Sequence, residues 1–129
     1  MMLLDTSVWL LTFRKHRPLK LETVLPLDEV VTCLPIIQEV LQGFRDERAF
    51  RIAHTAMNAL PAVETPLPRD VFEVAVSLYR DARRSGITIR SSVDCLIAAC
   101  ALRNGLTVLH RDRDFDALSR VSALRAQSV

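Results

Sequence analysis

The chain has 129 residues, of which 50% are hydrophobic and 25% are charged. This length and this balance argue against a disordered chain and predict a single globular domain over residues 1–129, with a substantial core. The formal net charge of +2 is too small to indicate, by itself, a protein that binds nucleic acid.

The cysteines and the apolar segments narrow the class of protein. Cys33, Cys95 and Cys100 are odd in number and lack metal-type spacing. We therefore expect buried free thiols in a reducing compartment rather than a disulfide framework or a zinc site. No run of 18 or more apolar residues exists, which argues against a membrane span. The apolar first residues lack a basic region and are interrupted by Asp5, so they do not resemble a signal peptide. A cytoplasmic protein is the expectation.

Short apolar runs alternate with helical patterns in the first half of the chain. Asp5 ends the first apolar run, and Thr6 and Ser7 are residues that commonly begin helices. Gly43 and Pro61 act as stop signals for two later helices. The predicted elements are a strand at residues 2–4, a helix from 8, a helix at 19–25, a strand at 30–34, and helices at 35–43 and 46–60.

The second half continues the alternation. A long amphipathic pattern ends at Gly86, and an alanine-rich apolar helix ends at Gly105. The predicted elements are a short strand at 62–65, a helix at 69–85, a helix from about 92 to 104, a strand at 106–110, a half-turn through Leu118 and an edge strand at 123–129. Such an alternation predicts an α/β fold with a short, mostly parallel sheet of four to five strands, flanked by helices on both faces.

Acidic residues follow the predicted strands at their carboxyl ends. Asp5 comes directly after the first strand, and Glu39 lies in the helix after the second strand. Asp112 and Asp114 lie just beyond the strand at 106–110. In open α/β sheets the ligand crevice lies outside the carboxyl ends of the strands. These acids are therefore expected where chemistry would occur.

Each acid also has a structural interpretation. Asp5 can cap a helix, although Thr6 and Ser7 are able to do so as well. Asp94 follows Ser91 with the spacing of a capping box, and an acid in the first turn of a helix favours the helix dipole. Asp112 and Asp114 flank an arginine, with which either could pair.

The acids considered together favour a metal site. Five carboxylates are predicted at or near one edge of one sheet, and converging carboxylates repel one another unless a cation lies among them. Oxygen ligands with few histidines select a hard ion, Mg²⁺ or Mn²⁺, over zinc. Such an ion lowers the pKa of bound water and offsets charge on a phosphoryl transition state.

Four segments in order make the chain resemble a PIN-domain protein, and most of all the VapC ribonuclease toxins of bacterial toxin–antitoxin pairs. They are LLDTSVW, QEVLQG, VDCLIAACALRNG and LTVLHRDRDF. Their order and separations are those usual in the family, and the pattern covers essentially the whole chain. The resemblance implies a PIN-like fold and a metal-dependent endoribonuclease that cleaves single-stranded or looped RNA, with tRNA and rRNA as candidate substrates.

The resemblance also assigns the site residue by residue. Asp5, Glu39, Asp94 and Asp112 fall on the family's metal-binding acids, and Asp114 falls in the adjacent acidic position. The pattern leaves open which of Asp112 and Asp114 ligates the metal directly, and we expect both to do so.

Two further features concern hydroxyl groups near the acids. Thr6 or Ser7 falls on a small hydroxyl residue that often assists in the family. The chain has His110 where the family often has threonine or serine, so a hydroxyl contact at that position is not expected to carry over.

Basic residues and partners complete the expectation. Arg14, Lys15, Arg17, Arg111 and Arg113 are candidate phosphate contacts, although a cluster such as the first three is more often a solvated surface. The resemblance further implies a VapB-like antitoxin, a toxin–antitoxin hetero-oligomer and a homodimer, with candidate dimer helices near residues 36–60.

Two other functions are alternatives to a nuclease. A receiver-like signalling domain needs a second acid beside Asp5 and a lysine late in the chain, whereas no lysine follows Lys20. A PIN module that binds RNA or protein without cutting is the closer alternative, and the intact set of acids argues against it.

Overall fold

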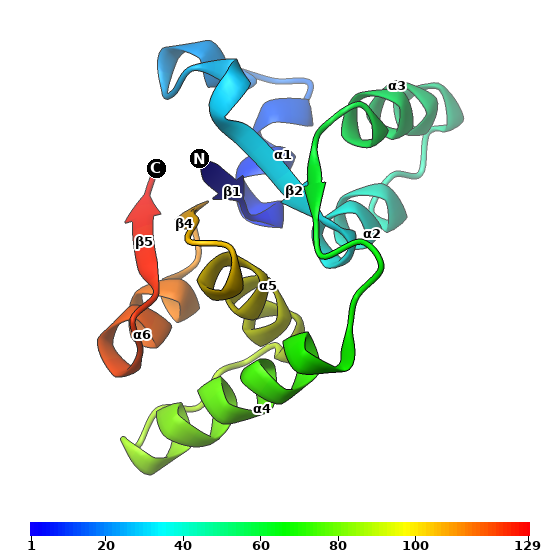
Figure 1. The fold of residues 1–129 in the computed structure, drawn as a ribbon. Helices are drawn as coiled ribbons and strands as arrows, with labels where there is room; N and C mark the ends of the chain where they lie inside the picture. The colour runs from blue at the N-terminus through cyan, green and yellow to red at the C-terminus, as the bar shows by residue number, and fades with distance from the viewer.

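Five short parallel strands form the central sheet, in the spatial order β3-β2-β1-β4-β5. The computed structural model describes residues 1–129 (Figure 1). The strands are β1 (Met2–Leu4), β2 (Val30–Cys33), β3 (Ala62–Val63), β4 (Thr107–His110) and β5 (Arg125–Ser128). The predicted α/β fold with a parallel sheet flanked by helices is confirmed.

Six helices flank this sheet in two groups. The first three helices pack in succession beside β1 and β2, and the last three pack together beside β4 and β5 (Figure 1). The helices are α1 (Thr6–Phe13), α2 (Leu34–Gln42), α3 (Glu47–Asn58), α4 (Arg69–Arg84), α5 (Ser92–Arg103) and α6 (Arg113–Val121). None of them is both long and apolar enough to cross a membrane.

The two innermost strand pairs are buried on both faces. Leu3 of β1 lies opposite Val31 of β2 and Val108 of β4, and none of these three side chains is appreciably exposed. Strands of this kind have continuous apolar sequences because neither face meets water. All strands run in the same direction, so the residues that follow β1, β2 and β4 meet at one edge of the sheet.

Helix α5 occupies the interior between this sheet and α4 (Figure 1). Residues 97–101, Ile-Ala-Ala-Cys-Ala, are fully buried, which is unusual for a helix at the surface of a domain. Small side chains allow neighbouring elements to approach from several sides, and they explain why the helix has no strongly polar face. The packing fixes the first turn of α5, where Asp94 lies.

Three predicted elements differ from the structure. Residues 19–25 form only a 3₁₀ turn at Leu21–Thr23, because Pro18 and Pro26 leave too little chain for a helix. The predicted strand at 62–65 ends at Val63, because Glu64 has a φ of 55°, which leaves the extended region.

The third difference bears on the site. Residues 113–121 form a helix of nine residues, not a half-turn. Asp112 caps this helix by accepting a hydrogen bond from the Asp114 main-chain N–H, and Phe115 and Leu118 anchor it in the core. The two acids that follow β4 are therefore held by a regular helical turn.

Candidate active site

An open cleft of about 300 Å³ lies at the carboxyl edge of the sheet, beyond β1, β2 and β4. All five predicted acids line it, together with both predicted hydroxyl residues. Its lining consists of Asp5, Thr6, Ser7, Leu10, Glu39, Arg90, Ser91, Asp94, Asp112 and Asp114. These residues lie in helices or loops that are far apart in the sequence, and the parallel sheet brings together the ends of the strands that precede α1, α2 and α6.

Three of the acids form a close group, here called the acidic triad: Asp94, Asp112 and Asp114. One carboxylate oxygen of each lies within 4.8 Å of the others. Asp94 comes from the first turn of α5, Asp112 is the N-cap of α6 and Asp114 lies in its first turn. Asp94 and Asp114 are only 6% and 5% exposed. Buried carboxylates at this spacing require a cation or a bound proton.

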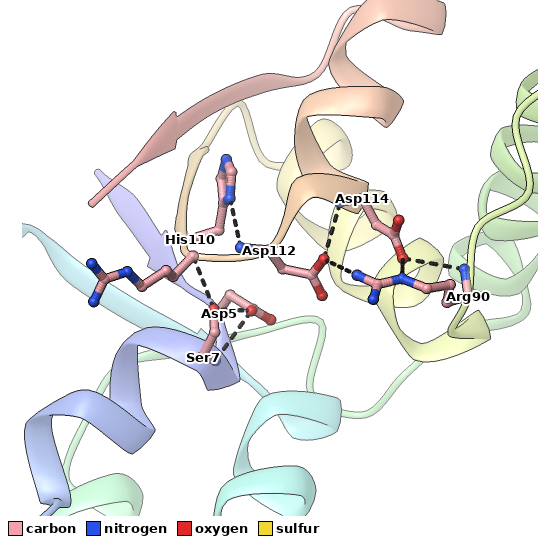
Figure 2. A network of polar contacts seen from close by, with 7 residues as sticks. Asp5, Ser7, Arg90, His110, Asp112 and Asp114 are labelled. Atoms are coloured by element: carbon pink, nitrogen blue, oxygen red, sulfur yellow. Dashed lines mark hydrogen bonds and ion pairs between the residues drawn. The ribbon is translucent and has the colours of Figure 1, made fainter.

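Asp5 lies beside the triad but is bound to its own helix. Its Oδ2 atom accepts hydrogen bonds from the Ser7 main-chain N–H at 3.1 Å and from Ser7 Oγ at 2.5 Å (Figure 2). Ser7 Oγ in turn accepts a hydrogen bond from the Arg111 main-chain N–H at 3.0 Å. Asp5 itself is thus the N-cap of α1, although the sequence offered Thr6 and Ser7 for that role. The bonds tie the loop after β4 to the end of β1.

Glu39 is held from across the cleft by the other predicted hydroxyl. Thr6 Oγ1 donates a hydrogen bond of 2.7 Å to Glu39 Oε1. Each of the two hydroxyl residues therefore binds a different acid, Ser7 binding Asp5 and Thr6 binding Glu39. Asp5 and Glu39 retain one carboxylate oxygen each that these hydroxyl groups do not bind.

Arg90 is the member of the site that sequence reasoning missed. Its Nη2 donates to Asp112 Oδ1 at 2.9 Å, and its Nε donates to Asp114 Oδ2 at 3.2 Å (Figure 2). Its main-chain N–H also donates to Asp114 Oδ2, at 3.1 Å. The available signal in the sequence was an arginine in the loop directly before an acid-bearing helix.

The electrostatics of the cleft show how strongly these acids repel. Burial, followed by the charges of Asp112, Asp5 and the other acids, raises the pKa of Asp94 to about 8. Burial also raises the pKa of Asp5, against the hydrogen bonds from Ser7. The Asp94 carboxyl, which keeps its proton near neutral pH, would release it when a cation binds among these acids. The possible metal ligands in the triad are all carboxylate oxygens, which are the ligands that a hard metal ion prefers.

Comparison with known proteins identifies the family. The model of the PIN domain matches residues 2–121. The ribonuclease VapC11 of Mycobacterium tuberculosis is 38% identical over 133 residues, which cover 99% of this chain and 98% of that protein.

This chain belongs to the PIN domain family, among the VapC proteins.

Solved structures confirm the fold of this PIN domain. VapBC2 from Rickettsia felis, bound to a DNA fragment from its promoter, matches with a TM-score of 0.78 at 13% identity, covering 99% of this chain and 98% of that one. VapBC-5 from Mycobacterium tuberculosis, a toxin–antitoxin family member, matches with a TM-score of 0.74 at 24% identity, covering 98% and 97%.

His110 of this PIN domain is a buried residue that contacts the main chain of the site. It is 1% exposed, and its Nδ1 accepts a hydrogen bond of 3.1 Å from the Asp112 main-chain N–H. Its Nε2 atom lies 3.2 Å from Asp116 Oδ1 without forming a hydrogen bond. The imidazole thus positions the main chain of Asp112, a role different from a hydroxyl contact.

The predicted phosphate contacts separate into two groups. Arg111 and Arg113 are exposed, form no ion pair and line a polar hollow next to the cleft. Arg14, Lys15 and Arg17 are exposed in the loop after α1 and line no part of the cleft. An eight-residue helix is about 12 Å long, which separates this loop from the acids.

Proposed function

We propose that this VapC protein is the toxin of a toxin–antitoxin pair and acts as a Mg²⁺- or Mn²⁺-dependent endoribonuclease on single-stranded or looped RNA. The observation that supports it most is the acidic triad, with three carboxylate oxygens within 4.8 Å of one another at the carboxyl edge of the sheet. VapC11 of Mycobacterium tuberculosis is named a ribonuclease, and the similarity covers 98% of its length. A cluster that only stabilised the fold would not need mutually repelling carboxylates.

The residues that would hold the ion are Asp94, Asp112 and Asp114, with Asp5 and Glu39 as further ligands in the same cleft. A divalent ion supplies an activated water and offsets negative charge on the phosphoryl group during phosphodiester hydrolysis. Around it, Ser7 and Thr6 keep Asp5 and Glu39 in place, and His110 fixes the loop that carries Asp112. Preorganisation of this kind limits the loss of side-chain freedom when the ion and the substrate bind.

The RNA backbone would approach along Arg111 and Arg113. Both guanidinium groups are exposed, and both line the hollow that adjoins the acids. Arginine binds phosphate in a fork, and this attraction is insensitive to base sequence. Arg14, Lys15 and Arg17 would contact phosphates farther along the strand, since their loop lies one helix length from the cleft.

The proposed partners follow from the same family membership. We infer a VapB-like antitoxin, because the similar solved structures are complexes of the VapBC type. We further infer a toxin–antitoxin hetero-oligomer and a homodimer that uses helices within residues 36–60. Ile52 on α3 is 59% exposed, which gives this region an apolar contact point. A ribonuclease with such a partner would act in the cytoplasm.

The test is cleavage of total cellular RNA by the purified full chain, free of antitoxin. RNA is incubated with Mg²⁺, with Mn²⁺ or with EDTA, and new 5′ ends are mapped by sequencing. We expect discrete new ends that require the metal and that are absent with Asp94→Asn. A folded, metal-loaded chain that produces no new ends would contradict the proposal and would favour a PIN module that binds without cutting.

A further inference from the structure

Arg90 is the only basic residue whose side chain forms an ion pair with the acidic triad. Its guanidinium uses one oxygen of Asp112 and one oxygen of Asp114, so each of the two carboxylates keeps a second oxygen (Figure 2). Arginine cannot lose its charge at physiological pH. The triad therefore already holds a permanent single positive charge before any metal arrives.

A divalent ion and this guanidinium would act on the same carboxylates. An ion bound to Asp112 and Asp114 would lie close to a fixed positive charge, and the two cations would repel each other. The Arg90 side chain is 57% exposed, so more than half of it is open to solvent. Solvent exposure also means that salt weakens the repulsion.

We propose that Arg90 is the resident counter-ion of the acidic triad and competes with the divalent ion, so that it raises the metal concentration at which the site fills. The inference rests on the proposed metal site. It assigns Arg90 a function that differs from ligation and from contact with RNA: without metal its single positive charge offsets part of the negative charge of Asp112 and Asp114, and with metal it opposes occupancy.

The contacts allow charge and geometry to be separated by mutation. In Arg90→Met the main-chain N–H of residue 90 can still donate to Asp114 Oδ2, and the Asp114 N–H can still donate to Asp112 Oδ1 at 3.0 Å. Both carboxylates thus keep a local bond that orients them, while the positive charge is removed. Arg90→Lys makes the converse change, because it keeps the charge and loses the planar fork.

Arg111→Met is the matched control. It removes one positive charge from the same edge of the sheet, and the Arg111 side chain forms no ion pair with the triad. The Arg111 contact to Ser7 uses the main-chain N–H and survives the substitution. A general effect of net charge would appear equally in both methionine variants, whereas direct competition would appear only at position 90.

The experiment is a Mn²⁺ titration of the full chain and the three variants, with free Mn²⁺ measured by electron paramagnetic resonance at low and high salt. We expect Arg90→Met to bind Mn²⁺ roughly tenfold more tightly than the parent chain at low salt, and the difference to shrink at high salt. Arg90→Lys and Arg111→Met should stay within about twofold of the parent. Circular dichroism confirms that each variant is folded.

Three outcomes would overturn the inference. If the parent chain binds Mn²⁺ and Arg90→Met binds it equally or more weakly, Arg90 does not compete with the ion, although the proposed metal site stands. If Arg111→Met tightens binding as much as Arg90→Met, the effect is one of general charge. If neither the parent nor Arg90→Met binds Mn²⁺, the metal site itself fails, and the proposed function fails with it.

Discussion

Replacement of Asp94 by asparagine should change how the stability of the metal-free protein depends on pH. The pKa of Asp94 is raised from 3.8 to about 8, first by burial and then by the neighbouring acids. The folded protein therefore keeps this proton at pH values where the unfolded chain has already lost it. Between about pH 4 and about pH 8 the unfolded state binds fewer protons, so the free energy of unfolding falls as pH rises.

The size of the effect follows from the same linkage. Each pH unit within this window lowers the free energy of unfolding by at most about 1.4 kcal/mol for one such carboxyl. From about pH 5 to about pH 7 the limit is thus about 2.7 kcal/mol, and water in the open cleft reduces it to an expected ~1–2 kcal/mol. Asp94→Asn has no proton to lose at this position, so its stability should lack this component.

The assay is urea denaturation of the parent chain and Asp94→Asn in EDTA at several pH values between these limits. We expect the parent to lose about 1–2 kcal/mol more than the variant as the pH rises. At about pH 7 the metal-free variant should be the more stable protein, although it has lost a metal ligand. Parallel pH profiles for the two proteins would refute the reasoning that burial and the neighbouring acids keep Asp94 protonated.

Three other predictions concern the ion, the supporting hydroxyl and the RNA. Mn²⁺ binding at neutral pH should displace the Asp94 proton, so calorimetry in buffers of different ionisation enthalpy should reveal proton release, and its absence would contradict the raised pKa. Thr6→Val should lower metal-dependent cleavage roughly tenfold because Glu39 loses its hydrogen bond, whereas Thr6→Ser should retain activity. Equal cleavage rates for the two variants would refute the role of the hydroxyl. Arg111→Gln and Arg113→Gln should each weaken RNA binding and reduce its salt slope by about one, and unchanged slopes would exclude phosphate contacts there.

Much of the site followed from local sequence. The strands β1, β2 and β4 are buried on both faces and so appear in the sequence as continuous apolar runs. A polar residue or a proline marks the end of each run. Parallel strands place those ends at one edge, and this is why Asp5, Glu39 and Asp112 could be expected in one cleft. Asp94 was harder to assign, because an acid in the first turn of a helix also has a structural explanation.

The remaining features depend on contacts that no local pattern encodes. Arg90 lies in the loop before α5 and binds Asp112 and Asp114 at the start of α6, 22 and 24 residues away in the sequence. Asp112 is both the N-cap of α6 and a member of the triad. Its role as a cap was not recognised in the sequence, so the predicted helix was shorter than the nine residues of α6. His110 sits in the core, where only the fold shows that its ring accepts a bond from a main-chain N–H.

The account depends most on the claim that the acidic triad binds a divalent ion. The direct measurement is a crystal structure of the chain grown with Mn²⁺, with anomalous diffraction recorded at the manganese absorption edge. We predict an anomalous peak within coordination distance of carboxylate oxygens of Asp94, Asp112 and Asp114. A fully ordered cleft without such a peak at saturating Mn²⁺ would contradict the account.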